Sequence, residues 1–313
     1  MTAKEISLEK DSQKLEAIIA YDPGKRGISH VATNVQGGLS NAVLDISQTK
    51  KPAVAILTGF YIPYCEYPAA ETDGPIGSAF LYNSLQKINI PTVIITDALC
   101  ERVVKKACTA INHENQINII VAENLSNDWE PDLWGKIEKL AGCKITHLVS
   151  IERPGKSHND NYYDMKGKVL NDYIEPLDML LPFCLKKKIV TIGIGDGGNE
   201  AGMGKIDTGI ISQFIPNGKT IQSIVTCDFV IPCGVSNWGG FAIAALILHK
   251  IGGFSKNEIK KVINEELHHT VLDHIVNQSK AIDGVTKKSE LKVDGLEESV
   301  HSNVIDKILN VFI

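Results

Sequence analysis

The chain has 313 residues, a formal net charge of −5 at pH 7, and an ordinary globular composition with 43% apolar and 22% charged residues. This charge gives no overall basic field, so we expect neither nucleic acid nor a membrane surface as a partner. Residues 1–20 lack the apolar core of a signal peptide, and no apolar run reaches the ~18 residues that a spanning helix needs. Seven cysteines without a C-x-x-C pair are typical of reduced thiols, so we expect a cytoplasmic protein.

Short apolar runs alternate with helical patterns along most of the chain. Residues 1–20 predict a first helix with Leu15, Ile18 and Ile19 on its apolar stripe, and a loop with the sequence DPGKRG follows at residues 22–27. Strands are then predicted at residues 53–57, 92–96, 116–121, 145–151, 189–194 and 229–233. Helices are predicted at residues 78–88, 98–111, 133–140, 173–187 and 238–251. This alternation predicts an α/β fold, with a mostly parallel sheet of about six strands and helices on both faces.

Residues 253–313 predict a C-terminal extension of helices and loops. Short helices are expected at residues 256–266, 270–278 and 300–309, and two related tripeptides lie between them, Ile282-Asp283-Gly284 and Val293-Asp294-Gly295. His268 and His269 lie in this late helical region, away from every strand end, and we expect both to be solvated. No linker is evident, so the N-terminal helix and the extension are expected to belong to a single domain spanning residues 1–313.

The segment Gly193–Lys205, with the sequence GIGDGGNEAGMGK, directly follows the fifth predicted strand and is the most informative part of the chain. Its glycines indicate tight turns or close approach of the backbone to a ligand, and such loops can hold an anion on backbone N–H groups. A plain surface loop is the alternative. Gly193, Gly195 and Gly198 match a dinucleotide-binding pattern, but Gly202 and Gly204 interrupt the helix which that pattern requires, so we expect no nucleotide cofactor.

Polar clusters follow the other predicted strands, where a parallel α/β sheet binds its ligands. They are Glu71–Pro75, Thr96-Asp97, Glu152–Gly155 with the following residues 158–163, and Gly234–Gly240. Thr72 or Asp73 could cap the helix that follows them, and so could Ser236 or Asn237. The planar guanidinium of Arg153 suits a carboxylate, although an internal pair with Glu152 would also explain it.

These clusters together predict a site for a small anionic molecule, such as an acidic amino acid. Carboxylates outnumber cations, which favours a hard divalent ion, Mg²⁺ or Mn²⁺, with Asp196, Glu200 and Asp73 as its ligands. Alternatively, one carboxylate acts as a general base. We expect catalytic roles for Glu200, Asp196 and Lys205. Substrate binding is expected from Glu71, Arg153, Asn161, Asn199, Ser236 and Asn237.

Five long motifs carry a resemblance: ETDGP, ERPG with the later NYYDMKG, TIGIGDGGNEAGMGK, GVSNWGG, and AIDGVT followed by VDGL. From about residue 22 onward the chain resembles the D-glutamate cyclase-like C-terminal domain family. The resemblance implies an α/β fold and a hydro-lyase that converts D-glutamate to 5-oxo-D-proline and water, stimulated by manganese.

Some members of that family carry a large N-terminal hydro-lyase-like domain, which these 313 residues do not contain. If that domain performs the chemistry, the activity does not transfer to this chain. Two other classes therefore stay open. One is a non-catalytic binding module for acidic amino acids or phosphorylated metabolites, and the other is a metal-dependent hydrolase of small phosphorylated compounds. Association of identical chains also stays open.

Overall fold

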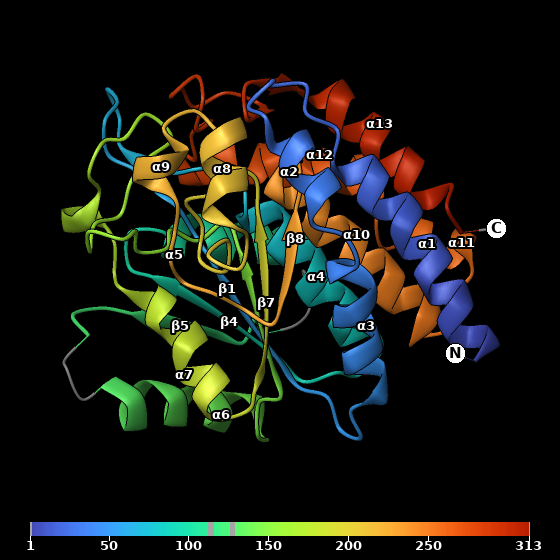
Figure 1. The fold of residues 1–313 in the computed structure, drawn as a ribbon. Coiled ribbons are helices and arrows are strands. Elements are labelled where there is room, and N and C mark those ends of the chain that lie inside the picture. The colour runs from blue at the N-terminus through green and yellow to red at the C-terminus, as the bar shows by residue number, and fades with distance from the viewer. Residues whose placement is uncertain (1, 112–115, 126–128, 313) are drawn as a thin grey trace.

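The computed structural model describes residues 2–111, 116–125 and 129–312, and its centre is a parallel sheet of six strands in the order β5-β4-β1-β6-β7-β8 (Figure 1). The strands are β1 (Val54–Thr58), β4 (Thr92–Asp97), β5 (Ile119–Ala122), β6 (His147–Ile151), β7 (Val190–Gly195) and β8 (Phe229–Pro232). Each of them falls on a strand expected from the sequence. The predicted α/β fold with a parallel sheet is therefore confirmed.

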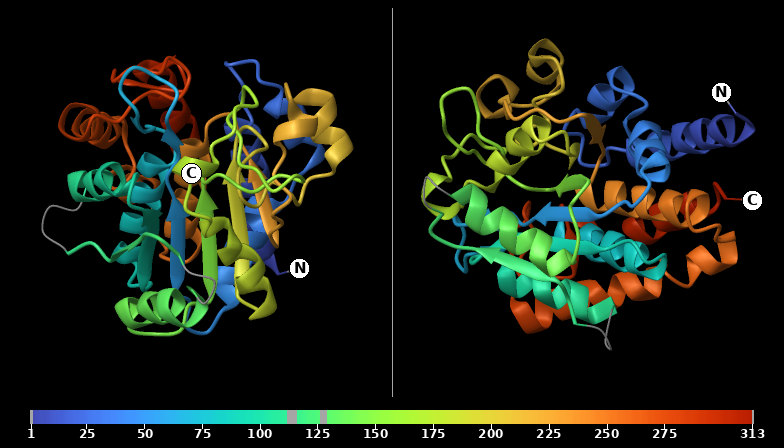
Figure 2. Two further views of the ribbon diagram at one scale, coloured as in Figure 1. Left: turned by 90° about the vertical axis from the view of Figure 1, so that its left-hand side faces the viewer. Right: turned by 90° about the horizontal axis from the view of Figure 1, so that it is seen from below.

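Helices cover both faces of this sheet (Figure 2). Successive side chains of a strand point to opposite faces, so Val54 and Ile56 of β1 enter one apolar core while Ala55 and Leu57 enter the other. The first core is covered by α1 (Ala3–Ile19), α3 (Gly38–Gln48), α4 (Pro75–Lys87), α5 (Glu101–Ile111) and α10 (Ser236–Lys250). The second core is covered by α2 (Ile28–Asn34), α6 (Gly135–Ala141), α7 (Leu180–Lys186), α8 (Thr208–Phe214) and α9 (Gly218–Ile221).

The strand order reverses direction next to β1. After β1 the chain adds β4 and β5 on one side, and it then crosses to the other side to add β6, β7 and β8. The helices after β1 and β4 lie on one face of the sheet, whereas those after β5, β6 and β7 lie on the other. The loops at the carboxyl ends of β1 and β6 therefore diverge, and such a switch point is where open α/β sheets bind ligands.

The C-terminal extension joins the first core. Its helices are α11 (Lys256–Lys260), α12 (Glu265–Asp273) with a π-helical turn at His274–Gln278, and α13 (Glu298–Leu309). A short hairpin of β9 (Lys292–Val293) and β10 (Leu296–Glu297) precedes α13 and carries Asp294 at its turn. Leu272, Val293 and Ile305 all belong to the same core as α10. His268 is fully buried there, so its expected solvation is wrong.

Several helical boundaries also differ from the expectation. The predicted helix at residues 173–187 begins only at Leu180, after two 3-10 turns at Asn171–Tyr173 and Leu177–Met179. Pro176 explains this, because it has no N–H to donate and disfavours helical geometry in the preceding residue. A π-helical turn at Glu130–Trp134 precedes α6. The sequence did not predict the hairpin of β2 (Tyr61–Ile62) and β3 (Ala69–Ala70), nor the helices α2, α3, α8 and α9.

The helices α4 and α10 cap each other. Asp73, just before α4, accepts hydrogen bonds from the backbone N–H groups of Ser236 (2.9 Å) and Asn237 (2.8 Å) at the start of α10. In return, Asn237 Oδ1 accepts from the N–H groups of Gly74 (2.9 Å) and Gly77 (2.6 Å) at the start of α4. The prediction that each helix is capped by its own flanking side chain is therefore wrong.

The crossing of these two helices depends on glycine. A Cβ atom added at Gly240 would lie 2.7 Å from the Cα of Gly77, closer than real Cβ atoms approach a backbone. The two helix starts can therefore come near enough for Asp73 and Asn237 to exchange caps only with glycine at the crossing.

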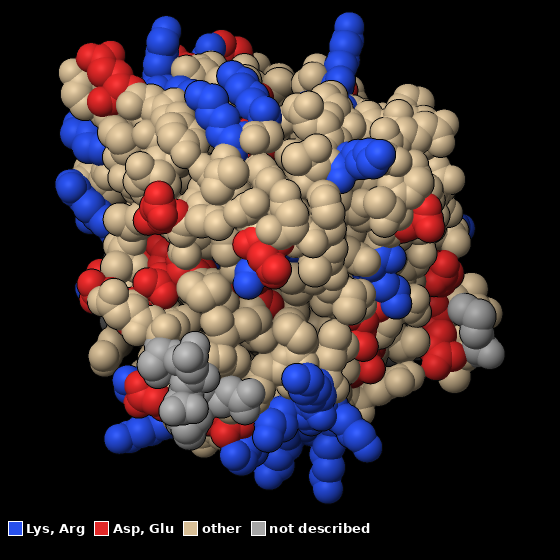
Figure 3. All heavy atoms as spheres, turned by 60° about the vertical axis from the view of Figure 1, so that its left-hand side comes forward, with Lys and Arg blue, Asp and Glu red and all other residues tan. Residues whose placement is uncertain are grey.

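The surface away from the carboxyl ends of the strands is rich in lysine. Figure 3 shows basic residues gathered at the lower end of the molecule. Exposed lysines precede three strands at this end: Lys50 and Lys51 before β1, Lys144 before β6, and Lys186, Lys187 and Lys188 before β7. Among the described residues, no helix is both long enough and apolar enough to cross a bilayer.

The exchanged caps generate a stability prediction. Replacing Asn237 with Ala leaves the buried N–H group of Gly77 without an acceptor and that of Gly74 with Asp73 Oδ1 alone, which should lower the free energy of unfolding by about 1–3 kcal/mol. Urea denaturation measures this, with Asn303→Ala, an exposed asparagine of α13, as the matched control. Equal effects of the two substitutions would contradict the capping role.

Candidate active site

A small cavity of about 170 Å³ lies at the carboxyl end of the sheet, beside the point where β1 and β6 diverge. Its polar wall consists of Arg26, Glu71, Glu152, Asp196, Asn199 and Asp294. Its apolar wall consists of Phe60, Ile62, Met165 and Val285. Exposed Lys166 and half-buried Lys287 also line it. A concave site with an apolar side and a few convergent polar groups is typical of small-molecule binding.

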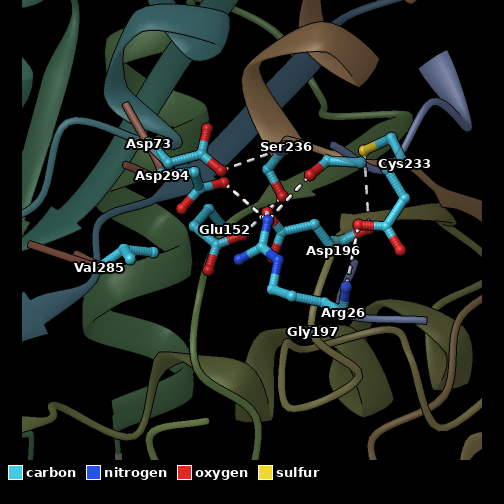
Figure 4. A network of polar contacts seen from close by, with 12 residues as sticks. Arg26, Asp73, Glu152, Asp196, Gly197, Cys233, Ser236, Val285 and Asp294 are labelled. Carbon is cyan, nitrogen blue, oxygen red and sulfur yellow. Dashed lines mark hydrogen bonds and ion pairs between the residues drawn. The ribbon is translucent and has the colours of Figure 1, made fainter. Parts of the chain in front are cut away.

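Arg26 is the central cation of the polar wall. The carboxylate of Asp22 accepts the N–H groups of Arg26 (3.0 Å) and Gly27 (2.8 Å), which folds this loop over the sheet. Arg26 Nη2 then donates to Asp196 Oδ2 (2.6 Å) and Asp294 Oδ2 (2.8 Å), two residues that Figure 4 draws beside it. It also donates to the carbonyl of Gly234 (2.8 Å). Nη1 and Nε donate no hydrogen bond to any described residue, so part of the guanidinium stays available to a ligand in the cavity.

The glycine-rich segment after β7 is organised around its own Glu200. The buried Glu200 carboxylate accepts three backbone N–H groups, from Asp196 (2.9 Å), Gly197 (2.6 Å) and Gly198 (2.7 Å). The anion held by this nest is therefore a side chain of the same loop. This arrangement fixes the turn that presents Asp196 to Arg26.

Glu152 stands at the end of β6 in an unusual backbone conformation. Its φ angle is +45°, in the left-handed region that costs energy for any residue except glycine. Its Oε2 accepts a hydrogen bond of 2.5 Å from the hydroxyl of Ser236, at the start of α10. Ser236 therefore orients the Glu152 carboxyl in the wall of the cavity.

Glu71 is the carboxyl of the wall that lacks a protein partner. It is 6% exposed, and its side chain accepts no hydrogen bond from the part of the chain that the structure describes. Gly284 lies against it, since a Cβ atom there would be 2.1 Å from Glu71 Oε2. The missing side chain of Gly284 thus lets its loop pack against the Glu71 carboxyl, whose oxygens stay available to a ligand.

Burial dominates the electrostatics of the wall. Burial, reinforced by the negative charges of neighbouring carboxylates, raises the pKa values of Glu71, Glu152 and Asp196 well above their usual range. The same causes raise the pKa of Asp73 to about 8. For Asp294 burial acts in the same direction, but the guanidinium of Arg26 outweighs it and lowers the pKa. The wall is therefore short of positive charge.

A family model described as D-glutamate cyclase-like, C-terminal, matches residues 15–309. The chain belongs to this family. It is 31% identical, over 330 aligned positions, to the human protein named mitochondrial D-glutamate cyclase. The alignment covers 98% of this chain and 52% of the human protein. The chain thus spans about half the length of that relative.

In this member of the D-glutamate cyclase-like family, the residues predicted for the site separate into three groups. Glu71, Asp196 and Asn199 line the cavity. Asp73, Glu200, Ser236 and Asn237 lie behind its wall and hold backbone or side-chain groups in place. Arg153, Asn161 and Lys205 lie outside the set of residues that line it.

The last group has other surroundings. Arg153 is fully buried, and its guanidinium donates to Asp97 Oδ2 (2.6 Å) and to the carbonyl groups of Gly59 (3.0 Å) and Glu175 (2.5 Å). Asn161 is half-buried and accepts from the side chain of Asn171 (2.8 Å), while Lys205 is exposed. The internal partner of Arg153 is Asp97, two strands away in the sheet from the expected Glu152.

Two sets of carboxylates are close enough to share a cation. In each set one oxygen from every residue lies within 4.8 Å of the others: Asp73, Asp196 and Asp294 form the first set, and Glu152, Asp196 and Glu200 the second. The predicted ligands Asp73, Asp196 and Glu200 are thus divided between the sets. All donors are carboxylate oxygens, which fits a hard divalent ion. Each set contains one carboxylate that already accepts backbone N–H groups on both oxygens, Asp73 in the first and Glu200 in the second.

Three residues of the wall were not selected from the sequence. Arg26 and Asp294 come from the N-terminal loop and the C-terminal hairpin, so a search restricted to strand ends does not reach them. The DPGKRG loop and the repeated Ile/Val-Asp-Gly tripeptide were the available signals. Glu152 was counted among the carboxylates at strand ends and as a partner for Arg153, but it was not selected as a site residue.

The shortage of positive charge generates a pH prediction for the metal-free protein. Because Asp73 has an ordinary pKa of 3.8 and a folded-state pKa of about 8, the folded protein keeps a proton that the unfolded chain has lost between these values. Stability should therefore fall as pH rises from about 7 toward about 8, by at most about 1.4 kcal/mol per pH unit for the proton on Asp73, and its contribution should level off above about pH 8. The buried His268 and His301, whose pKa values are lowered, are neutral in both states over this window. Urea denaturation in the presence of a chelator measures the slope, and a flat or rising profile would contradict it.

Proposed function

We propose that this chain is a hydro-lyase that converts D-glutamate to 5-oxo-D-proline and water. The observation that carries the proposal is a buried wall of carboxylates around one guanidinium, at the switch point of a chain in the D-glutamate cyclase-like family. The human relative, which is named for D-glutamate cyclisation and is 31% identical, supports the same reaction. Seven free cysteines fit a reducing compartment, so we place the reaction in the cytoplasm.

The charges of D-glutamate complement those of the cavity. Its ammonium group would supply the positive charge that Glu71 and Glu152 lack. The unused N–H groups of Arg26 suit one substrate carboxylate, because a guanidinium presents donors in a planar fork. Lys166 and Lys287 are available for the second carboxylate. Holding the folded conformer of the substrate would bring its nitrogen next to its γ-carboxyl carbon.

The reaction moves two protons from nitrogen to oxygen. The nitrogen forms a bond to the γ-carboxyl carbon, one carbon–oxygen bond of that carboxyl breaks, and the two protons lost by the ammonium group leave with the oxygen as water. We assign the transfers to Glu71 and Glu152, one carboxyl starting ionised and the other protonated, so that the pair returns to its initial state after both transfers. Asp196 and Glu200, first expected to be catalytic, would instead fix Arg26 and the loop.

A divalent ion, Mn²⁺ or Mg²⁺, is part of the proposal. Asp73, Asp196 and Asp294 would hold it, and its charge would stabilise the negative charge that develops on the carboxyl oxygen.

Chiral chromatography of D-glutamate and 5-oxo-D-proline tests the reaction directly. Purified protein should interconvert the two compounds from either direction, with and without added Mn²⁺, and should turn over L-glutamate far more slowly. Binding of D-glutamate without any conversion would replace the proposed enzyme with a binding module. Failure to bind or convert it would reject the proposal.

Glu71→Gln tests the assigned proton transfer. The amide keeps the shape of the side chain but cannot exchange a proton, so kcat should fall about 10²–10⁴-fold. Glu66→Gln, an exposed residue between β2 and β3, is the matched control and should leave kcat unchanged. Unchanged kcat in Glu71→Gln, with the wild-type protein active, would remove Glu71 from the reaction and leave the reaction itself standing.

A further inference from the structure

The Arg26 guanidinium occupies the place where a cation would be held. Its Nη2 lies 2.6 Å from Asp196 Oδ2 and 2.8 Å from Asp294 Oδ2, and those two residues form, with Asp73, the first set of clustered carboxylates. A divalent ion such as Mg²⁺ bonds to oxygen at about 2.0–2.1 Å. An ion bound to both oxygens on the side that Nη2 occupies would therefore overlap it, and at that position the ion and the guanidinium exclude each other.

The other residues of the wall indicate that Arg26 alone does not neutralise or hydrogen-bond all of its carboxylates. Glu71 lines the same cavity, is more than nine-tenths buried, and has no hydrogen-bond partner among the described residues. Asp73 and Asp196 are buried as well, at 2% and 3% exposure, so little solvent screens the carboxylates from one another. Within the buried wall, the guanidinium of Arg26 is shared by more acidic groups than it can pair, whereas Lys166 and Lys287, which also line the cavity, are more exposed.

Arg26 also has N–H groups that could bind a different partner. Only Nη2 is bound to carboxylates, while Nη1 and Nε make no hydrogen bond within the described part of the chain. Arg26 itself lines the cavity, next to the space that a substrate carboxylate would fill under the proposed function. A small rotation of its side chain would exchange two internal carboxylates for one carboxylate of a ligand.

We infer that Arg26 and a divalent cation compete for Asp196 and Asp294, and that cation binding releases the guanidinium toward the substrate. Arg26 is then an internal substitute for the ion and keeps the acidic wall folded while no ion is bound. The competition concerns ion binding alone. Only the direction in which Arg26 is released rests on the proposed function.

Calorimetric titration with Mn²⁺, in the absence of any substrate, tests the competition. Arg26→Met should bind Mn²⁺ about tenfold or more tightly than the wild type, because it removes both the competitor and its charge. Lys166→Met is the matched control, since it removes one positive charge from the same cavity without touching Asp196 or Asp294. Its Mn²⁺ affinity should stay within about twofold of the wild type. No gain for Arg26→Met, or an equal gain for Lys166→Met, would overturn the inference.

A second measurement uses the unaltered protein and does not depend on the variant folding. Side-chain NMR of arginine, with Mg²⁺ as a diamagnetic probe, should show the Arg26 guanidinium signals shifting and exchanging faster with water as the ion binds. The buried Arg153 signals provide an internal control and should not change. Arg26 signals that stay unchanged at saturating Mg²⁺ would overturn the inference. Neither experiment involves turnover, so either can fail while D-glutamate conversion stands.

Discussion

The exchange of helix caps between Asp73 and Asn237 is the constraint on which the site depends. Each residue satisfies N–H groups of the helix that the other begins, so α4 and α10 can only start side by side. Glu71 lies two residues before Asp73, and Ser236, which orients Glu152, lies one residue before Asn237. The same contacts that close two helix termini therefore bring together carboxyls from different segments of the chain, Glu71 just after β3 and Glu152 just after β6.

The arrangement is costly for the fold. Buried carboxylates lose the solvation of water, and in this wall only Arg26 is placed to compensate them. The protein responds by keeping protons on part of the cluster, as the raised pKa values indicate. A wall that is stable only when it is protonated or paired is suited to a ligand that carries its own positive charge, whether an amino acid or a metal ion.

The strands and helices that show a regular pattern of apolar residues could be predicted from the sequence. The strands of the sheet carry short apolar runs, and in β1, β4 and β6 every residue is buried. The glycine segment after β7 stands out by composition alone. The role of that segment could not be inferred, since nothing local indicates that Glu200 would accept the N–H groups of its own loop. Asp73 and Asn237 were recognised as capping residues, but the helix that each caps is fixed by tertiary contact.

The site is hardest to predict where its residues contact partners that are distant in the sequence. Arg153 and Arg26 are both arginines near acidic segments, and only the fold shows that Arg153 pairs with Asp97 while Arg26 faces the cavity. Asp294 reaches the wall from a hairpin of two-residue strands, too short to give a periodic signal. Neither contact is encoded in the spacing of residues along the chain.

We propose that this acidic cavity binds D-glutamate through its charges, and a crystal structure of the protein equilibrated with D-glutamate would reveal the pose. We expect ligand density in the cavity, with the nitrogen of D-glutamate or of 5-oxo-D-proline facing Glu71 and Glu152 and a carboxylate on Arg26. A cavity free of ligand at saturating concentration, or a ligand bound with its carboxylates against Glu71 and Glu152, would contradict it.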